Sequence, residues 1–191
     1  MDRYKGDAGY IRKQKRFLIF KTILQFGVVA ALFVLGLVQT KTRLNLLTVV
    51  AVLGCLPAAK TLVQLIVIIP YKSISQEKHA DLEQKAPGLT KSYDMVVTDS
   101  KHFMPIESLV ILDNTVCGYT SHSKIDVNVA NKHIKEILVQ NQYDKVSVKI
   151  FNDYTAFITR AEGMQNMAAV SRPDTKKKEE GIKRVICQIS L

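Results

Sequence analysis

Three carboxylates between residues 94 and 113 are of the type that binds a divalent cation for hydrolysis. Asp94, Glu107 and Asp113 lie in or beside apolar segments that predict strands, so a sheet could bring them together. No fixed spacing links them. The four histidines also lack H-x-x-x-H spacing, and no C-x-x-C pair occurs, so we predict no metal site.

A cysteine between two histidines is the second candidate for chemistry. Cys117 lies between His102 and His122, and a thiol activated by an imidazole is a nucleophile. A cysteine beside Gly118 on an apolar strand is, however, more often core packing. Neither G-x-x-x-x-G-K-[ST] nor G-x-G-x-x-G is present, so no phosphate-binding loop is expected. We therefore predict no catalytic residue, no cofactor and no enzyme activity.

Two apolar stretches near the N-terminus predict membrane-spanning helices. A bilayer core is about 30 Å thick and needs roughly 20 apolar helical residues. The uncharged stretches 22–38 and 44–59 reach that length as spans over 17–38 and 44–69, if Lys21 and Lys60 are tolerated. The connector, Gln39 to Arg43, is long enough only for a turn. Residues 17–70 are thus expected to form a transmembrane hairpin.

Polar residues within these spans are the most unusual feature of the sequence. Pro57, Lys60 and Gln64 are spaced i, i+3, i+7 on one helical face, and Lys21 and Gln25 are spaced i, i+4. One interpretation is helix packing, with glutamines hydrogen-bonding across helices and Lys60 extending to the membrane surface. The other is that several hairpins assemble around a wet path lined by Lys60 and Gln25, which would favour anions. Pro57 is expected to kink its helix.

A basic leader over residues 1–16 sets the expected orientation. It includes a cluster next to the first span: Arg12, Lys13, Lys15 and Arg16. Lys and Arg accumulate on the cytoplasmic side, so both termini of this two-pass protein are predicted to be cytoplasmic, in the cell (inner) membrane. A cleaved signal peptide is disfavoured because the apolar run is long and a second span follows.

The net charge of the whole chain, +10, comes mainly from residues 1–71. Residues 1–71 hold ten basic and two acidic side chains, whereas residues 72–191 hold seventeen and fifteen. Attraction to anionic lipid explains the excess, so a nucleic-acid partner is not expected. Three scattered cysteines suit a reducing compartment.

Residues 71–191 predict one cytoplasmic α+β domain. The expected elements are a polar helix over 73–85, strands over 93–98, 103–112 and 115–120, a helix from 127, a strand over 146–150, a helix from 154 to about 163, a polar loop over 164–180 and a strand over 184–191. Asp113 and Asn114 predict a tight hairpin turn. The core order is β-β-β-α-β-α-β.

In element order alone, this region resembles the restriction-endonuclease-like fold, which binds a metal through an acid on its second strand and an acid-x-Lys on its third. Glu107 would match the first element, but TVCGYTS has neither an acid nor a lysine, so the resemblance implies an inactive relative. Our leading hypothesis is a non-enzymatic, self-associating membrane-anchored protein that recognises a protein or small ligand. The alternatives are an oligomeric pore-forming effector and a membrane-tethered nuclease-like hydrolase.

Overall fold

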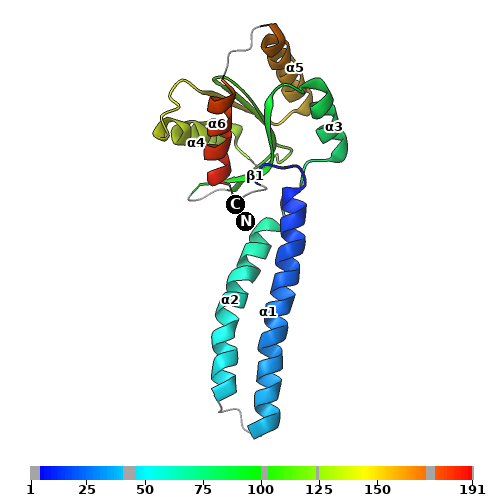
Figure 1. The fold of residues 1–191 in the computed structure, drawn as a ribbon, viewed down its shortest axis with the longest axis vertical. Helices are drawn as coiled ribbons and strands as arrows, with labels where there is room; N and C mark the ends of the chain where they lie inside the picture. The colour runs from blue at the N-terminus through cyan, green and yellow to red at the C-terminus, as the bar shows by residue number, and fades with distance from the viewer. Residues whose placement is uncertain (1–4, 41–45, 100–102, 124, 171–174, 191) are drawn as a thin grey trace. The chain divides into compact units, whose positions relative to one another are not determined.

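The computed structural model describes residues 5–40, 46–99, 103–123, 125–170 and 175–190 (Figure 1). The chain divides into two compact units, residues 11–71 and residues 1–10 together with 72–191. Residues 41–43 of the expected connector, which runs from Gln39 to Arg43, and His102 lie outside the described residues. We describe each unit by itself.

The first unit is a hairpin of two long helices, α1 (Tyr10–Thr40) and α2 (Leu46–Ile68). Buried or half-buried residues of α2 recur at alternating intervals of three and four: Ala51, Gly54, Ala58, Thr61, Leu65 and Ile68. This spacing is typical of two helices packed along a common seam. Small residues at the seam permit close approach, and a Cβ at Gly54 would lie 3.1 Å from Cγ2 of Val29.

Both helices are long and apolar enough to cross a membrane, as the sequence predicted. Only 11 % of the apolar window of α1 and 28 % of that of α2 are buried, so most of their apolar side chains are exposed. The bounds differ from the expected spans mainly at the start. α1 begins at Tyr10 rather than at residue 17, because Arg, Lys and Gln at positions 12–16 favour helix.

The second unit contains a four-stranded mixed sheet in the order β1-β2-β3-β4. β1 (Thr90–Thr98), β2 (Phe103–Leu112) and β3 (Thr115–Tyr119) form the expected antiparallel meander. Asp113, with a φ of 46°, makes the predicted tight turn between β2 and β3. β4 (Ser147–Phe151) pairs parallel to β3 and forms one edge of the sheet.

Helices cover both faces of this sheet (Figure 1). α3 (Gln76–Lys85) and α5 (Tyr154–Val170) pack on one face, around Leu82, Val110 and Phe157. α4 (Val127–Gln140) and α6 (Lys176–Gln188) pack on the other, around Leu109, Ile134 and Ile182. Burial on both faces explains the nearly continuous apolar sequence of β2.

The loop expected over 164–180 and the strand expected over 184–191 are wrong where the structure describes them, because residues 164–170 and 176–188 are helical. Residues 171–174 and 191 lie outside the described part of the chain. α5 continues past Gly163 to Val170, and α6 spans Lys176 to Gln188, so the core order ends in two helices. The buried residues Glu179, Ile182 and Ile186 are spaced three and four apart, which is the period of a helical face. The charged run at 176–180 concealed this period in the sequence, because Glu179, the residue of the run that lies on the buried face, is itself charged.

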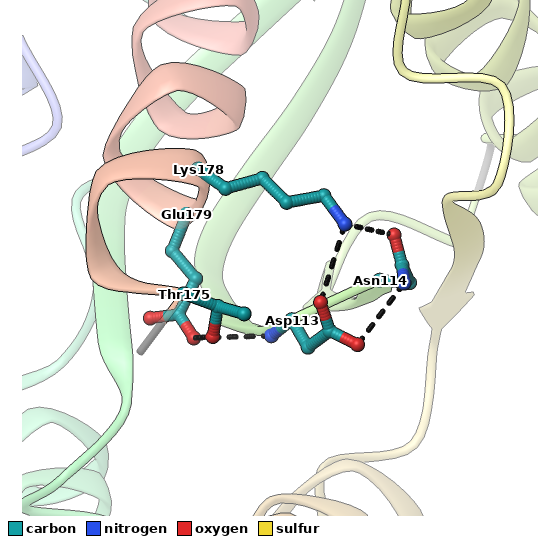
Figure 2. A network of polar contacts seen from close by, with 5 residues as sticks. All are labelled: Asp113, Asn114, Thr175, Lys178 and Glu179. Atoms are coloured by element: carbon teal, nitrogen blue, oxygen red, sulfur yellow. Dashed lines mark hydrogen bonds and ion pairs between the residues drawn. The ribbon is translucent and has the colours of Figure 1, made fainter. Parts of the chain in front are cut away.

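The buried residue Glu179 connects α6 to the sheet through a polar network (Figure 2). Its carboxylate accepts hydrogen bonds from the Asp113 backbone amide at 3.0 Å and from the hydroxyls of Thr90 at 2.6 Å and Thr175 at 3.1 Å. Lys178 binds Asp113 and Asn114 at the surface of the same turn. The β2–β3 turn and the first turn of α6 are thus held together.

Residues 5–9 belong to the α+β unit rather than to a free leader. Gly6 forms an antiparallel bridge with Tyr93, and the Lys5 ammonium donates to the Ser190 carbonyl at 3.0 Å. The buried carboxylate of Asp94 accepts from the backbone amides of Gly9 at 2.7 Å and Ile74 at 2.8 Å. One side chain therefore holds the chain just before α1 and just after α2.

Candidate functional site

A pocket of about 610 Å³ lies between the edge strand β4, its neighbour β3 and helix α5. Its lining follows the periods of these elements. The strands contribute alternate residues and α5 contributes one helical face: Thr115, Cys117, Ser147, Lys149, Phe151, Ala156, Thr159, Arg160 and Gly163. Helix α5 packs mainly over β3 and less over β2 and β4.

The register of β3 and β4 orders the pocket floor along its length. Thr115 pairs with Ser147, and Cys117 pairs with Lys149. Phe151 lies at the far end of β4, where α5 begins three residues later and turns back over the sheet. Ala156 is therefore near the Phe151 end, and Gly163 is near the Ser147 end. The floor runs from hydroxyls, through a cation, to an aromatic ring.

Two cations give the pocket a positive charge. Lys149 and Arg160 are both exposed, and the lining contains no carboxylate. The Lys149 ammonium lies 5.1 Å from the centre of the Phe151 ring. Burial raises the pKa of the Cys117 thiol, and Arg160 and Lys149 offset part of that rise. Cys117 is thus a protonated thiol at neutral pH, buried beneath the cations rather than poised as a nucleophile.

A helical glycine keeps one wall of the pocket open. A Cβ placed on Gly163 would meet nothing within 4 Å, so the fold itself does not require glycine there. Glycine inside a helix costs about 1 kcal/mol relative to alanine. Its use at Gly163 widens the pocket at the expense of helix stability.

The carboxylates singled out in the sequence have separate structural partners. Asp94 binds the two backbone amides described above, Glu107 accepts a hydrogen bond from Ser121, and Asp113 pairs with Lys178. Within the part of the chain that the structure describes, no group of three or more His, Cys, Asp or Glu side chains is placed to hold a metal ion. His122 does not line the pocket that contains Cys117.

The polar residues of the hairpin divide between two faces. Gln25 is half-buried and accepts a hydrogen bond of 2.5 Å from the hydroxyl of Thr61. Pro57, Lys60 and Gln64 lie on the exposed side of α2, away from this seam, and Lys21 on α1 is half-buried. The structure thus brings Gln25 to Thr61 rather than to Lys60. The sequence did contain a signal for Thr61: it is spaced three residues after Ala58 and four before Leu65, which places all three on one face of α2.

The basic cluster of the leader lies on the first turns of α1. Arg12, Lys13 and Arg16 are exposed. Lys15 donates a hydrogen bond of 2.5 Å to the Ile69 carbonyl, just past the end of α2, where a cation compensates the negative end of the helix dipole. At least one cluster residue therefore joins the two helices of the hairpin.

No protein-family model, curated protein or solved structure matches this chain. Lys149 and Arg160 were not recognised as site residues from the sequence. Alternation along 147–151 places Lys149 on the face of Ser147 and Phe151, but the partner face of α5 becomes identifiable only when the sheet order is known.

Proposed function

We propose that this protein is a membrane-anchored, non-enzymatic binding protein that takes a small anionic ligand in the β3–β4–α5 pocket. The observation that supports the proposal is the pairing of Lys149 with Arg160 in a lining that contains no acid. Two cations at a concave site attract and orient an anion, whereas a solvated surface cation has no such cavity. Among the described residues there is no cluster of metal-binding side chains, and the pKa of the Cys117 thiol is raised; both observations favour binding over catalysis.

The anchor is the α1–α2 hairpin. Two adjacent helices with long apolar, exposed surfaces favour insertion in a bilayer with both ends of the hairpin on one side. The basic residues of α1 favour the cytoplasm as that side. We expect the full chain to resist alkaline carbonate extraction of inner membranes. A tag on its C-terminus should be cleaved by protease only in inverted vesicles, and cleavage in right-side-out vesicles would contradict this orientation.

Anion binding is tested on the full chain in mild detergent by thermal unfolding, with added sodium phosphate compared with sodium chloride at equal ionic strength. Ligand that binds the folded state raises the unfolding temperature. We expect a rise specific to phosphate that is lost in Lys149→Met and Arg160→Met. Lys135→Met and Arg184→Met change the same residue types at exposed positions of α4 and α6, on the other face of the sheet, and should retain it. Equal behaviour of phosphate and chloride would overturn the proposal.

A second candidate function is an oligomeric membrane effector, favoured by the exposed position of Lys60 on α2. A charge facing lipid is costly, and copies of the hairpin arranged around a wet path would relieve that cost. Light scattering of the detergent-solubilised chain should then give a closed oligomer of four or more copies. In liposomes, Lys60→Leu should alter anion leakage. A monomer or dimer without leakage would exclude this function.

A further inference from the structure

We infer that the ligand of the β3–β4–α5 pocket is a phosphate ester that carries a flat apolar ring, an inference that rests on the function proposed above. The argument uses the size of the pocket, its hydrogen-bond donors and the order of side chains along its floor.

The size of the pocket favours an organic ligand over a bare ion. Sites for small molecules generally occupy about 300 to 1,000 Å³. The volume of about 610 Å³ falls inside this range and exceeds what an inorganic anion fills. The charged groups of the ligand should therefore occupy only part of the pocket.

The donors near the cations favour phosphate over carboxylate. Arg160 presents a planar fork of N–H groups and Lys149 a compact ammonium, while Thr115 and Ser147 add hydroxyls in the same lining. A carboxylate has two oxygens in one plane. A terminal phosphate has three oxygens spread around phosphorus, so it can bind the guanidinium, the ammonium and at least one hydroxyl together.

The remainder of the ligand is directed toward the apolar end of the pocket. Beyond Lys149, the floor continues to the half-buried ring of Phe151, and Ala156 of α5 lines the same pocket with only a methyl group. A phosphate held at Lys149 and Arg160 would place an attached group between Phe151 and Ala156. A flat ring suits that space because it can stack on Phe151, and the small side chain of Ala156 leaves room for it.

The test compares four probes in thermal unfolding of the full chain in detergent: phenyl phosphate, inorganic phosphate, glycerol 3-phosphate and benzoate. We expect phenyl phosphate to stabilise the protein at concentrations at least tenfold lower than any other probe. Benzoate tests a ring without phosphate. Glycerol 3-phosphate tests an ester without a ring and represents a phospholipid headgroup.

A pair of matched variants locates the ring. Ala156→Leu fills the apolar end of the pocket near Phe151, so phenyl phosphate should become no better than inorganic phosphate. Ala169→Leu makes the same change at an exposed position of α5 outside the pocket and should leave all four probes unaffected.

The outcomes separate this inference from the function on which it rests. If phenyl phosphate and inorganic phosphate stabilise the chain equally, or glycerol 3-phosphate stabilises it most, the inference of a ring is wrong, whereas the proposal of anion binding stands. If benzoate matches phenyl phosphate, phosphate recognition is wrong. If none of the probes stabilises the chain, both the inference and the proposed function fail. A phenyl phosphate preference that survives Ala156→Leu would place the ring elsewhere and overturn the assignment.

Discussion

Glu179 and Lys178 are adjacent residues of one polar network, but they differ in burial (Figure 2). Glu179 is fully buried and accepts three hydrogen bonds, whereas the Lys178 side chain is 38 % exposed. Removing the Glu179 carboxylate leaves the Asp113 amide and the Thr90 hydroxyl without this hydrogen-bond acceptor. We expect Glu179→Ala to lower the free energy of unfolding by about 2 to 4 kcal/mol.

Lys178→Ala is the matched control for this prediction. A half-exposed ion pair contributes about 1 kcal/mol or less, since water replaces the lost contact. Chemical denaturation of both variants in detergent measures the two effects. Equal losses in the two variants would show that the burial of Glu179 does not decide the energetics of the network.

Tyr93 makes stability depend on alkaline pH. Burial and its 2.7 Å hydrogen bond to Glu83 raise the pKa of this phenol well above its ordinary value. The folded chain therefore keeps the Tyr93 proton after the unfolded chain has lost it. This contribution to stability is complete below about pH 10 and declines as the pH rises further.

Tyr93→Phe tests this dependence. The variant should be less stable by about 1 kcal/mol at pH 8, and the difference should narrow above pH 10. Burial and a hydrogen bond to Asp81 also raise the pKa of Tyr154, so ultraviolet absorption of the wild type should show more than one phenol that ionises late. The amplitude of this late phase should be smaller in Tyr93→Phe. An unchanged titration curve would contradict the assignment.

At the scale of elements, close packing of α1 and α2 depends on Gly54. Its absent side chain leaves room for Val29, whereas a Cβ at Gly27 would meet nothing within 4 Å. We expect Gly54→Leu to destabilise the hairpin by about 1 to 3 kcal/mol through overpacking. Gly27→Leu should be neutral or stabilising by up to about 1 kcal/mol, because leucine favours helix. The two variants are compared by titration with a harsh detergent, in which the loss of the helical circular dichroism signal reports unfolding of the hairpin.

Local patterns in the sequence predicted most of the elements but few of their neighbours. Alternation predicted β4, and the turn residues Asp113 and Asn114 predicted the β2–β3 hairpin. α6 was missed because Glu179, a charged residue, occupies its buried face. Its burial depends on Thr90 and Asp113, which are far away in the sequence.

The candidate pocket could not be predicted for a similar reason. Lys149 and Arg160 come from a strand and a helix that face each other only because β4 joins the sheet parallel to β3. The hairpin was easier to predict because length and apolar composition are local properties. The partner of Gln25 required the relative rotation of two helices, which depends on packing and not on either sequence alone.

At the scale of the whole molecule, the unit that follows the hairpin in sequence also includes residues that precede it. Residues 1–10 form one compact unit with 72–191, joined through Gly6 to Tyr93 and through Lys5 to Ser190. A fragment that begins at residue 72 therefore lacks part of its own fold. Experiments on such a fragment would understate the stability of the α+β unit.

Asp94 turns the hairpin into an insertion within a continuous domain. Its two carboxylate oxygens bind the amides of Gly9 and Ile74, so the cut ends of the chain would lie a few ångströms apart once residues 10–73 are removed. A linker of about three residues is long enough to rejoin them. We expect this rejoined protein to be soluble and to unfold several degrees above the 72–191 fragment, as measured by calorimetry. Equal unfolding temperatures would mean that residues 5–9 contribute nothing to the stability of the domain. A higher unfolding temperature of the rejoined protein would imply that the hairpin is a removable insertion and that the α+β domain folds without it.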